Sequence, residues 1–572
     1  MNNIEIAEIF REIAQILEIK GENVFRIRAY ERAAQNIESL TEDISDFIKN
    51  DSLSDIPGIG KDLSDKIKEI YITGKLKFLS DLKKTIPEGL LEILKIPSVG
   101  PKTAKLLYDK LKIKSISDLE SAIKKNKLAG IFGIKEKTIE NIQKGIELVK
   151  KGKERMSLAI AMDVANYFTN ALSRIPEVKE ISTAGSLRRK KETVRDIDIL
   201  VVSNFPGKIM DVFTKLPAVK RIMAKGETKS SVLTKDDVQV DVRVVEEKEF
   251  GAALLYFTGS KNFNVKLRHI AQRNQQKINE YGVFSVKGPK EKYLAGKTEE
   301  EIFKFLKLDY IEPEMREDTG EIELASKHKL PKLIDIEDIK GDLHTHSTYS
   351  DGGNSISDMA KAAIKKGYQY IALTDHSQSL RVANGMSAAD LKKKKAEIEK
   401  LNNNFKNFVI LYGTEVDIDS GGNLDYKDSI LEEFDIVVAA IHTGFKQSKS
   451  QITKRIVNAC KNKHVDIIAH PTGRLWGTRE PYDFDFDEIL KVANDTGTFL
   501  EINAFPNRLD LNDVHSRAAK EKGVKLSIGT DSHLFEQLDN MRFGVAVARR
   551  GWLEKNDVVN TLNVENLLKI KK

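Results

Sequence analysis

The chain has little of what marks secreted, disulfide-bonded or membrane-spanning proteins. Its 572 residues include one cysteine, Cys460, which excludes an internal disulfide and any CxxC metal site and fits a reducing cytoplasm. No apolar run approaches the ~20 residues that cross a bilayer. The start, MNNIEIAEIFREIAQ, is charged and helical rather than signal-like. We therefore expect a cytoplasmic protein, and the length predicts about three or four domains.

The chain also lacks a large excess of charge of either sign. The net charge is +7, with 40% apolar and 31% charged residues, as in soluble globular proteins. Lys and Arg exceed Asp and Glu by seven in residues 1–340, whereas the two groups are equal in number in residues 341–572. This distribution is typical of phosphate-backbone binding by the first part of the chain, although a solvated lysine-rich surface has the same composition.

Three aspartates on two predicted strands indicate a metal site. Residues 184–202, AGSLRRKKETVRDIDILVV, combine a Gly-Ser turn, a basic cluster and a strand in which Asp196 and Asp198 share one face, roughly 7 Å apart. VQVDVRV, residues 238–244, places Asp241 opposite its valines. If the strands pair, the three carboxylates converge and need cations, which predicts two-metal phosphoryl transfer. The alternative, two half-exposed strands with solvated acids, does not explain the turn or the third aspartate.

These residues resemble family X DNA polymerases, the group that includes DNA polymerase beta. The resemblance implies that Asp196 and Asp198 bind both metals, Mg²⁺ or Mn²⁺, and that Asp241 binds the catalytic one and takes the primer hydroxyl's proton. It extends to YFTGSKNFNVKLR, residues 256–268, which matches the family's sugar-reading turn, its contact to the incoming base and its contact to the template strand. The implied nucleotide-binding residues are Gly185, Ser186, Arg189, Tyr256, Phe257, Gly259 and Asn264, and Arg268 is implied to bind DNA.

Two glycine turns near the N-terminus predict non-specific DNA binding. IPGIGK at residues 56–61 and IPSVGPK at residues 96–102 each open a helix, and free N–H groups at such a terminus bind phosphate without reading sequence. The matched flanks indicate helix-hairpin-helix motifs, and residues 132–135 form a degraded third copy. The residues that we expect to bind DNA here are Gly58, Gly60, Lys61, Gly100 and Lys102.

The same region resembles the lyase domain of these polymerases. The match places Lys66 at the family's Schiff-base lysine, which needs a lowered pKa so that its neutral amine can attack the aldehyde of an abasic sugar. Arg26 and Tyr30 fall on the family's 5′-phosphate pocket, and Arg26 stands where polymerase beta has a lysine. The alternative is that Lys66 is a solvated member of a lysine-rich amphipathic helix.

The C-terminal part predicts a barrel of alternating strands and helices. Eight of the ten histidines lie after residue 341, and most directly follow an apolar run. Parallel strands that alternate with helices close into a barrel, so that residues at the strand ends meet at one mouth. Nine ligands exceed what one zinc needs and fit a cluster of about three Zn²⁺ or Mn²⁺ ions. The nine are His344, His346, Asp351, His376, Glu415, His442, His470, Asp531 and His533.

These C-terminal motifs resemble the polymerase and histidinol phosphatase (PHP) family, and all nine positions of its metal set are filled. The resemblance implies phosphoester hydrolysis. Arg474, four residues after His470, is a candidate for meeting the substrate phosphate. FLEINA, residues 499–504, is a further strand without an obvious ligand. The remaining histidines have no such context, and we interpret them as structural or solvated.

Together the resemblances imply a multidomain fold: α-helical helix-hairpin-helix domains, an α+β nucleotidyltransferase palm with a thumb/fingers subdomain, and a C-terminal α/β barrel, the (β/α)7-like PHP domain. The expected boundaries are a lyase-like helical domain 1–79, a second helical DNA-binding subdomain 80–150, the palm 151–247, the nucleotide-selecting subdomain 248–318, a linker 319–338 and the PHP domain 339–572.

The implied function is a monomeric repair DNA polymerase that fills short gaps in DNA bearing a 5′-phosphate, using dNTPs. Its barrel would act as a 3′-5′ exonuclease, with 3′-phosphate removal, cleavage at abasic sites and 5′-dRP lyase activity as further candidate activities. The alternative is a DNA-end-processing phosphoesterase whose polymerase half mainly binds DNA. A non-catalytic DNA-end scaffold is a third hypothesis, and both complete metal sets disfavour it.

Overall fold

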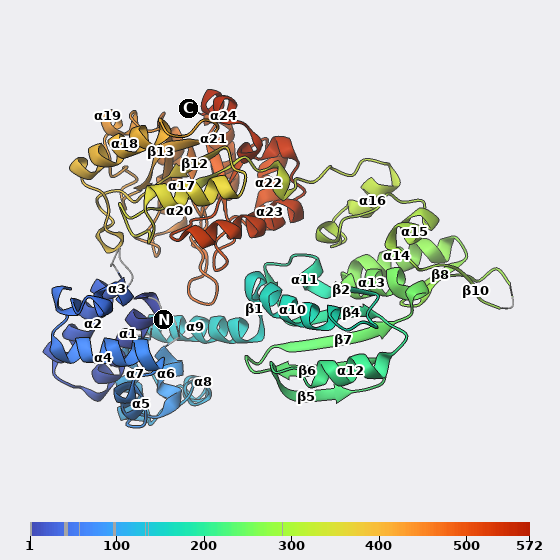
Figure 1. The fold of residues 1–572 in the computed structure, drawn as a ribbon, viewed down its shortest axis with the longest axis horizontal. Coiled ribbons are helices and arrows are strands. Elements are labelled where there is room, and N and C mark those ends of the chain that lie inside the picture. The colour runs from blue at the N-terminus through green and yellow to red at the C-terminus, as the bar shows by residue number, and fades with distance from the viewer. Residues whose placement is uncertain are drawn as a thin grey trace.

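Two helical units form the N-terminal part of the structure. The computed structural model describes residues 3–38, 44–56, 58–94, 96, 99–131, 133–134, 136–288 and 290–571. The first helices share one apolar core and the next share another, to which Ile19 also contributes. They are α1 (Asn3–Lys20), α2 (Val24–Glu38), α3 (Ile44–Lys49), α4 (Lys61–Thr73) and α5 (Lys77–Lys83), followed by α6 (Glu88–Leu94), α7 (Pro101–Leu111), α8 (Ile116–Lys124) and α9 (Glu136–Glu154). Helix α9 leads from them to the palm (Figure 1).

The palm is a five-stranded mixed sheet with the strand order β2-β4-β7-β6-β5. Its central strands β4 and β7 are parallel, and β4 is antiparallel to β2. Ile197, Ile199 and Val201 of β4 face a core that includes α10 (Leu158–Ser173) and α12 (Pro206–Thr214), whereas Leu200 and Val202 pack against α13 (Phe250–Thr258). The strands are β2 (Glu180–Thr183), β4 (Asp196–Val202), β5 (Val219–Lys225), β6 (Lys229–Thr234) and β7 (Gln239–Val245).

The thumb follows the palm and has a core of its own. It consists of α13, α14 (Lys261–Arg273), the antiparallel strands β8 (Gln276–Asn279), β9 (Gly282–Ser285) and β10 (Lys292–Ala295), and α15 (Glu299–Phe305). The stretch 319–338, expected as a linker, contains α16 (Glu321–Ser326). Ile322 and Ala325 of this helix are buried in the thumb core, and so is Trp552 from the far end of the chain.

The C-terminal part is a barrel of seven parallel strands in chain order, β11 to β17. A parallel bridge between Thr345 and Ser532 joins the first strand to the segment after the last. Alternation along β12 sends Tyr370 to one core and Ile371 to another. The strands are β11 (Gly341–Thr345), β12 (Tyr370–Leu373), β13 (Val409–Asp417), β14 (Ile436–Ala440), β15 (Ile467–Ile468), β16 (Phe499–Asn503) and β17 (Leu526–Gly529).

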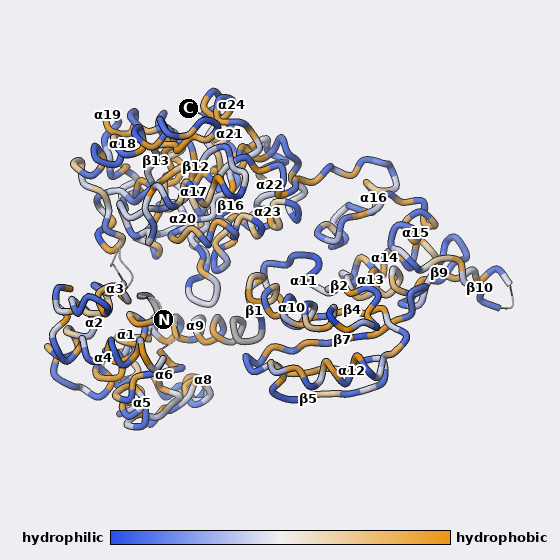
Figure 2. Tube along the Cα trace, viewed as in Figure 1, coloured by the Kyte–Doolittle hydropathy of each residue, from blue (hydrophilic) through white to orange (hydrophobic). Residues whose placement is uncertain are grey.

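Helices surround the barrel, and the apolar residues gather inside it and along the palm strands (Figure 2). The helices are α17 (Ile356–Lys365), α18 (Ala388–Asn402), α19 (Asp428–Leu431), α20 (Lys449–Lys461), α21 (Phe486–Thr496), α22 (Asp513–Glu521), α23 (Met541–Arg550) and α24 (Val564–Ile570). Within the described residues, no helix combines the length and the apolar content that crossing a bilayer requires.

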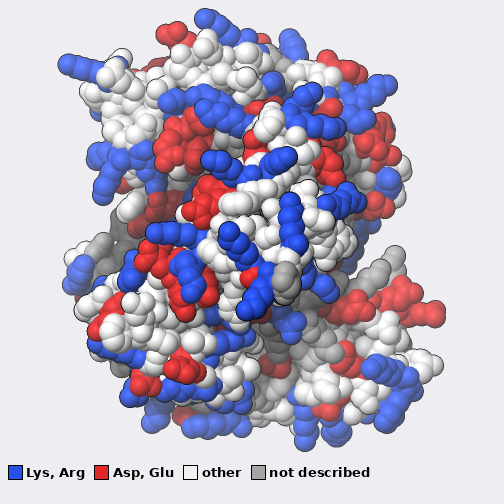
Figure 3. All heavy atoms as spheres, turned by 90° about the vertical axis from the view of Figure 1, so that its right-hand side faces the viewer, with Lys and Arg blue, Asp and Glu red and all other residues white. Residues whose placement is uncertain are grey.

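Polar contacts tie the barrel to the polymerase-like half. The Arg550 guanidinium at the end of α23 donates to the carbonyl of Arg189 at 2.8 Å and to Glu317 Oε1 at 3.1 Å. Arg474, in the loop after β15, pairs with Glu192 at 2.6 Å. Basic and acidic side chains are interspersed on the face shown in Figure 3, so the net positive charge of the first half does not form one continuous basic surface on that face.

Candidate active sites

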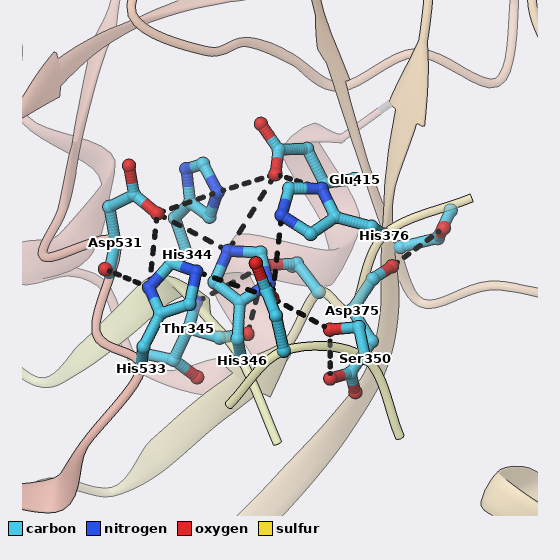
Figure 4. Close-up of polar contacts among 12 residues, drawn as sticks. His344, Thr345, His346, Ser350, Asp375, His376, Glu415, Asp531 and His533 are labelled. Atoms are coloured by element: carbon cyan, nitrogen blue, oxygen red, sulfur yellow. Dashed lines mark hydrogen bonds and ion pairs between the residues drawn. The ribbon is translucent and has the colours of Figure 1, made fainter. Parts of the chain in front are cut away.

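The mouth of the barrel collects the nine predicted metal ligands. They lie at or just after the carboxyl ends of strands, because parallel strands all present the same end to one side of the barrel. Figure 4 shows imidazoles and carboxylates from different strands pointing toward one another. His470 Nε2 lies 3.1 Å from Glu415 Oε1, and His442 Nε2 lies 3.3 Å from the same oxygen. The sequence-predicted ligands are therefore brought together by the fold.

Three groups of these side chains have ligand atoms close enough to hold metal ions. Within each group, all the ligand atoms lie within 4.8 Å of one another, and His346 and His376 each belong to two groups. In the described part of the chain these are the groups found, and the palm aspartates are not among them. The groups are His346, Asp351, His376 and His533; His344, His346 and Asp531; and His376, Glu415 and His442.

The cluster contains buried polar atoms that no hydrogen bond satisfies. A buried imidazole nitrogen or carboxylate oxygen without a partner is rare in proteins and costs free energy unless a ligand binds it. Here the unsatisfied atoms are the candidate ligand atoms themselves, so the site fits metal ions. They are His344 Nε2, His346 Nδ1 and Nε2, His376 Nδ1, His470 Nδ1 and Glu415 Oε2; His376 Nδ1 and Glu415 Oε2 lie 2.9 Å apart but without hydrogen-bond geometry.

Burial and neighbouring charges set the protonation of the imidazoles. Burial lowers the pKa of His346 to about 4. Burial, together with the positive charge of Arg508, lowers the pKa of His470 to about 3. For His442 the Glu415 carboxylate outweighs burial and raises the pKa to about 9. His346 and His470 are thus neutral at pH 7 and offer the lone pairs that a metal requires.

Two carboxylates that the sequence analysis missed orient the ligands. Glu501, the middle residue of β16, accepts from His344 Nδ1 at 2.7 Å and from the backbone N–H of His470 at 2.7 Å. Asp417 lies 3.0 Å from His442 Nδ1. Such partners fix the ring orientation of a metal-binding histidine and leave its other nitrogen for the ion. The signal was present, because Glu501 is a lone carboxylate within the apolar strand FLEIN and Asp417 follows Glu415 at the strand repeat of two.

A buried ion pair between Lys394 and Asp375 lies next to the first candidate ligands, because Asp375 precedes His376 and accepts a hydrogen bond from Ser347, which follows His346. The Lys394 ammonium of α18 is fully buried and lies 2.7 Å from Asp375 Oδ2, and it donates to the carbonyls of Leu373 and Gly413 at 2.8 and 2.9 Å. Asp375 in turn accepts from Ser347 N–H at 2.6 Å. The burial of Lys394 is not evident from the sequence, because this residue lies within a run of four lysines that is typical of a solvated helix face.

The palm brings the three predicted aspartates to one end of the sheet. Strands β4 and β7 pair in parallel with Asp198 beside Asp241 and Asp196 beside Gln239. These residues alternate with buried neighbours such as Ile197, so the carboxylates share the face that α13 covers further along β4. Three carboxylates gathered in this way form a donor set of the kind that Mg²⁺ and Mn²⁺ prefer.

The pKa of Asp198 is consistent with three carboxylates close together. Burial, with the negative charges of Asp196 and Asp241, raises the pKa of Asp198 to about 6. Gly185 makes the close approach possible, because a Cβ at this position would lie 2.3 Å from Asp198 Oδ2 and the glycine has a φ of +64°. Any other residue at position 185 would both clash and adopt an unfavourable backbone conformation.

The predicted nucleotide-binding residues line the junction of palm and thumb. Arg189 donates to the Thr258 carbonyl and, at 3.1 Å, to Glu317 Oε1. Asn264 donates to the carbonyl of Tyr256 at 2.7 Å. Ser186 is half-buried, and the Arg243 guanidinium lies 4.6 Å from the centre of the Phe257 ring. A Cβ added to Gly259 would lie 3.2 Å from the Arg189 guanidinium. Arg268 donates from Nε to the Asn264 carbonyl at 3.3 Å.

The three candidate lyase residues meet around one aromatic ring, that of Phe78. The ring of Tyr30 stacks on it with a centroid separation of 6.2 Å, and Lys66 Nζ and the Arg26 guanidinium lie 5.3 and 5.5 Å from its centroid. Lys66 also pairs with Asp62 one helical turn earlier. The side chain of Lys66 is 14% exposed, so it is more buried than a solvated surface lysine.

The two glycine turns have matching geometry. Gly60 and Gly100 each precede a helix, α4 and α7, with φ, ψ of −89°, 178° and −86°, 172°. Gly58 has a φ of +79°. Lys61 and Lys102 lie in the first turns of these helices. The predicted Pro57, Pro97 and Ser98, and Phe132 and Lys135 of the degraded copy, lie outside the described residues.

Arg474, the candidate phosphate contact, is bound to other protein groups. Its Nε donates to the carbonyl of Arg508 at 2.7 Å, and its NH2 group pairs with Glu192 at 2.6 Å and also donates to the Leu509 carbonyl. It therefore fixes the loop after β16 to the palm. Arg508 itself, which the sequence analysis did not mention, lies 3.4 Å from Asp531 Oδ2.

Family models match four segments of the chain. A helix-hairpin-helix domain matches residues 1–76, and a SAM-like helix-hairpin-helix tandem matches residues 90–147. The DNA polymerase beta thumb matches residues 253–317, and the PHP domain matches residues 342–505. These segments coincide with the helical units, the thumb and the first part of the barrel.

Relatives cover the whole chain or one half of it. The chain is 42% identical over 569 residues, 99% of each protein, to the DNA polymerase/3′-5′ exonuclease PolX of Bacillus subtilis (strain 168). A probable phosphatase of Thermoanaerobacter sp. (strain X514) is 33% identical over 232 residues, 38% of this chain and 89% of that protein. DNA polymerase lambda of Rattus norvegicus is 24% identical over 344 residues, 55% of this chain and 56% of that protein.

Proposed function

Because the chain belongs to the family X DNA polymerases with a C-terminal PHP domain, we propose that it fills short gaps in DNA and trims 3′ ends at a separate centre. The resemblance drawn from the sequence is confirmed, and so is the expected fold class. The chain is an enzyme, a DNA-directed DNA polymerase with a 3′-5′ exonuclease domain.

One observation carries the proposal: the ligand-type side chains form two separate constellations on two different folds. Carboxylates alone gather at the palm, on the paired strands of Asp198 and Asp241. Imidazoles with carboxylates gather at the barrel mouth. Oxygen-only sets prefer Mg²⁺ or Mn²⁺, and mixed nitrogen and oxygen sets prefer Zn²⁺ or Mn²⁺. Two such sites fit two different phosphoester reactions.

In the palm, Asp196, Asp198 and Asp241 would hold two divalent ions, which when bound neutralise phosphate charge and lower the pKa of the primer 3′-hydroxyl. The hydroxyl oxygen attacks the α-phosphorus of the dNTP, and the bond to the β-phosphate breaks. Asp241 accepts the proton of the primer hydroxyl. Gly185, Ser186 and Arg189 bind the triphosphate, and preorganised donors of this kind stabilise charge that develops in the transition state.

At the barrel, the nine side chains would hold about three Zn²⁺ or Mn²⁺ ions, which when bound polarise the phosphate and activate water. The chain's own part is to position the donors. Glu501 orients His344 and the backbone of His470, and Asp417 orients His442. The buried, neutral imidazoles stay available for ligation at pH 7.

The N-terminal units would hold the DNA that borders the gap. The turns before α4 and α7 present free N–H groups to backbone phosphates. Arg26 and Tyr30 would bind the 5′-phosphate, and Lys66 beside them would act as the lyase amine, supported by their shared contact with Phe78. Removal of 3′-phosphates and cleavage at abasic sites belong to the barrel in this proposal, and the chain acts as a monomer.

Inactivating each site separately tests which site catalyses which reaction. Primer extension on gapped DNA and 3′-end degradation are measured for Asp198→Ala and His344→Ala, with exposed Asp211→Ala as the palm control. We expect Asp198→Ala to lose nucleotide addition and retain nuclease activity, and His344→Ala to do the reverse. Loss of nuclease with retained addition in Asp198→Ala would reverse the assignment. Absence of addition in every barrel-inactivated chain would favour a phosphoesterase whose polymerase half only binds DNA.

A further inference from the structure

Three arginines lie on the loops beside the barrel's metal-type cluster, and two of them have fixed protein partners. Arg474 is bound to carbonyls and to Glu192. Arg479 donates from Nε to the Gly473 carbonyl at 2.6 Å, and its guanidinium stacks on a phenylalanine ring at 3.8 Å. The third, Arg508, has a different environment.

Arg508 carries a buried donor that has no partner. Its side chain is 15% exposed, and its NH1 group is buried without any hydrogen bond. A guanidinium has five N–H donors in a rigid fork, and leaving one of them buried without an acceptor costs free energy. Such a group in a native protein indicates an acceptor that binds there, and the fork suits a phosphate or a carboxylate.

The position of Arg508 connects it directly to the metal-type cluster. Asp531 uses Oδ1 toward His346 Nε2 at 3.3 Å and Oδ2 toward Arg508 Nε at 3.4 Å. The guanidinium therefore contacts one oxygen of a candidate metal ligand whose other oxygen faces a histidine. Its charge also acts on His470, another member of the set.

The loop that carries Arg508 is closed by the backbone. Asn503 and Asp510 exchange two hydrogen bonds, of 2.5 and 3.1 Å, at its base, and Arg474 holds the Arg508 carbonyl from outside. The Asn503 side chain donates to Asp531 Oδ2 at 3.1 Å. A guanidinium held in this way is preorganised, so binding an anion costs little conformational entropy.

We propose that Arg508 binds a non-bridging oxygen of the phosphate hydrolysed at the barrel mouth, which in this chain is the 3′-terminal phosphodiester of DNA. This inference rests on the proposed function and adds the residue that recognises the substrate's charge. Arg508 thereby takes the role that the sequence analysis assigned to Arg474. During hydrolysis negative charge builds up on the non-bridging oxygens, so the contact strengthens toward the transition state.

Exonuclease kinetics with the full-length, Mn²⁺-loaded chain test the contact. Wild type, Arg508→Gln, Arg508→Lys and the control Arg479→Gln are compared on oligonucleotides whose 3′-terminal linkage is a phosphodiester or an uncharged methylphosphonate. We expect Arg508→Gln to lower kcat/KM on the phosphodiester by about 100-fold, the effect of removing one oxyanion donor. On the methylphosphonate, Arg508→Gln and wild type should differ by less than about threefold, because the charge that Arg508 recognises is absent. Arg508→Lys should fall between them, and Arg479→Gln should stay close to wild type.

A binding measurement gives a second readout that does not depend on turnover. Titration calorimetry with inorganic phosphate should show affinity for Mn²⁺-loaded wild type that falls about tenfold in Arg508→Gln and not in Arg479→Gln. Bound Mn²⁺, measured by mass spectrometry, should be equal in all four proteins. Equal phosphate affinity in Arg508→Gln and Arg479→Gln would overturn the inference, because Arg508 would then make no contact with the phosphate. Loss of Mn²⁺ from Arg508→Gln would also overturn it, because Arg508 would then act only through Asp531. A wild type without exonuclease activity would instead refute the proposed function.

Discussion

The buried Lys394–Asp375 pair supports a prediction about the stability of the barrel. Lys394→Met keeps the length of the side chain but removes the ammonium that Asp375 and two backbone carbonyls surround. Both side chains are fully buried, so the variant leaves a carboxylate without a counter-charge. Breaking a buried pair in this way costs about 3–5 kcal/mol.

The neighbouring lysine provides a matched control. Lys395 is on the same helix, and its side chain is 39% exposed and pairs with Glu433 at 3.0 Å. Lys395→Met should cost at most about 1 kcal/mol, because an exposed pair is screened by water. For a domain of this size, about 3–5 kcal/mol corresponds to a decrease in Tm of about 6–20 °C.

Tryptophan fluorescence is a selective assay for this effect. Both tryptophans of the chain lie in the C-terminal part, Trp476 in a barrel loop and Trp552 in the thumb core, so the emission reports on the barrel and its contact with the thumb rather than on the helical units. Thermal unfolding is followed for both variants and for Lys394→Met combined with Asp375→Asn, which should recover part of the loss. Equal Tm values for Lys394→Met and Lys395→Met would refute the reasoning.

Further predictions concern the two sites. Burial and two neighbouring aspartates raise the pKa of Asp198 to about 6 from 3.8, so metal-free stability should fall as pH rises through this window. Asp198→Asn in EDTA should therefore be more stable to urea at pH 8 by about 1–3 kcal/mol, and equal stability would contradict the shift. Gly185→Ala should abolish gap filling and spare the exonuclease, because its Cβ would meet Asp198 Oδ2 at 2.3 Å. Glu501→Gln should weaken Mn²⁺ binding at the barrel about 10–100-fold in a metal titration, and unchanged affinity would remove its orienting role. Glu317→Gln removes the carboxylate that Arg189 contacts at 3.1 Å. The KM for dNTPs should therefore fall about fivefold in steady-state primer extension. A raised KM would show instead that Glu317 positions Arg189.

Much of the architecture was predictable because short-range patterns determine it. In β4, carboxylates alternate with apolar residues, and a period of two is enough to assign Asp196 and Asp198 to one face. In the C-terminal part, apolar runs end in His, Asp or Glu, and parallel strands place such ends at one mouth. The nine side chains that the fold brings together at the mouth were therefore predicted without knowledge of any contact, and their role as metal ligands stays a prediction.

Residues that act through another residue were not predictable in this way. Lys394 looks like its lysine neighbours, and only burial separates it from them. Glu501 lies within a strand as Glu415 does, but its role follows from which histidine lies beside it. Similarly, Arg474 and Arg508 are both loop arginines, and the partners of each guanidinium distinguish them. Helix α16 lies in the stretch expected as a linker, since its six residues are too few to show a helical pattern.

The sequence by itself determined the family, the order of the domains and the identity of the metal-type side chains, because strand alternation and motif spacing are local properties of the chain. The tertiary structure decided how the two halves meet and which charged side chains pair with one another. Those outcomes depend on pairs far apart in the chain, such as Arg550 with Glu317 and Arg508 with Asp531. The energy of each pair is set by burial and by the neighbours that folding brings together.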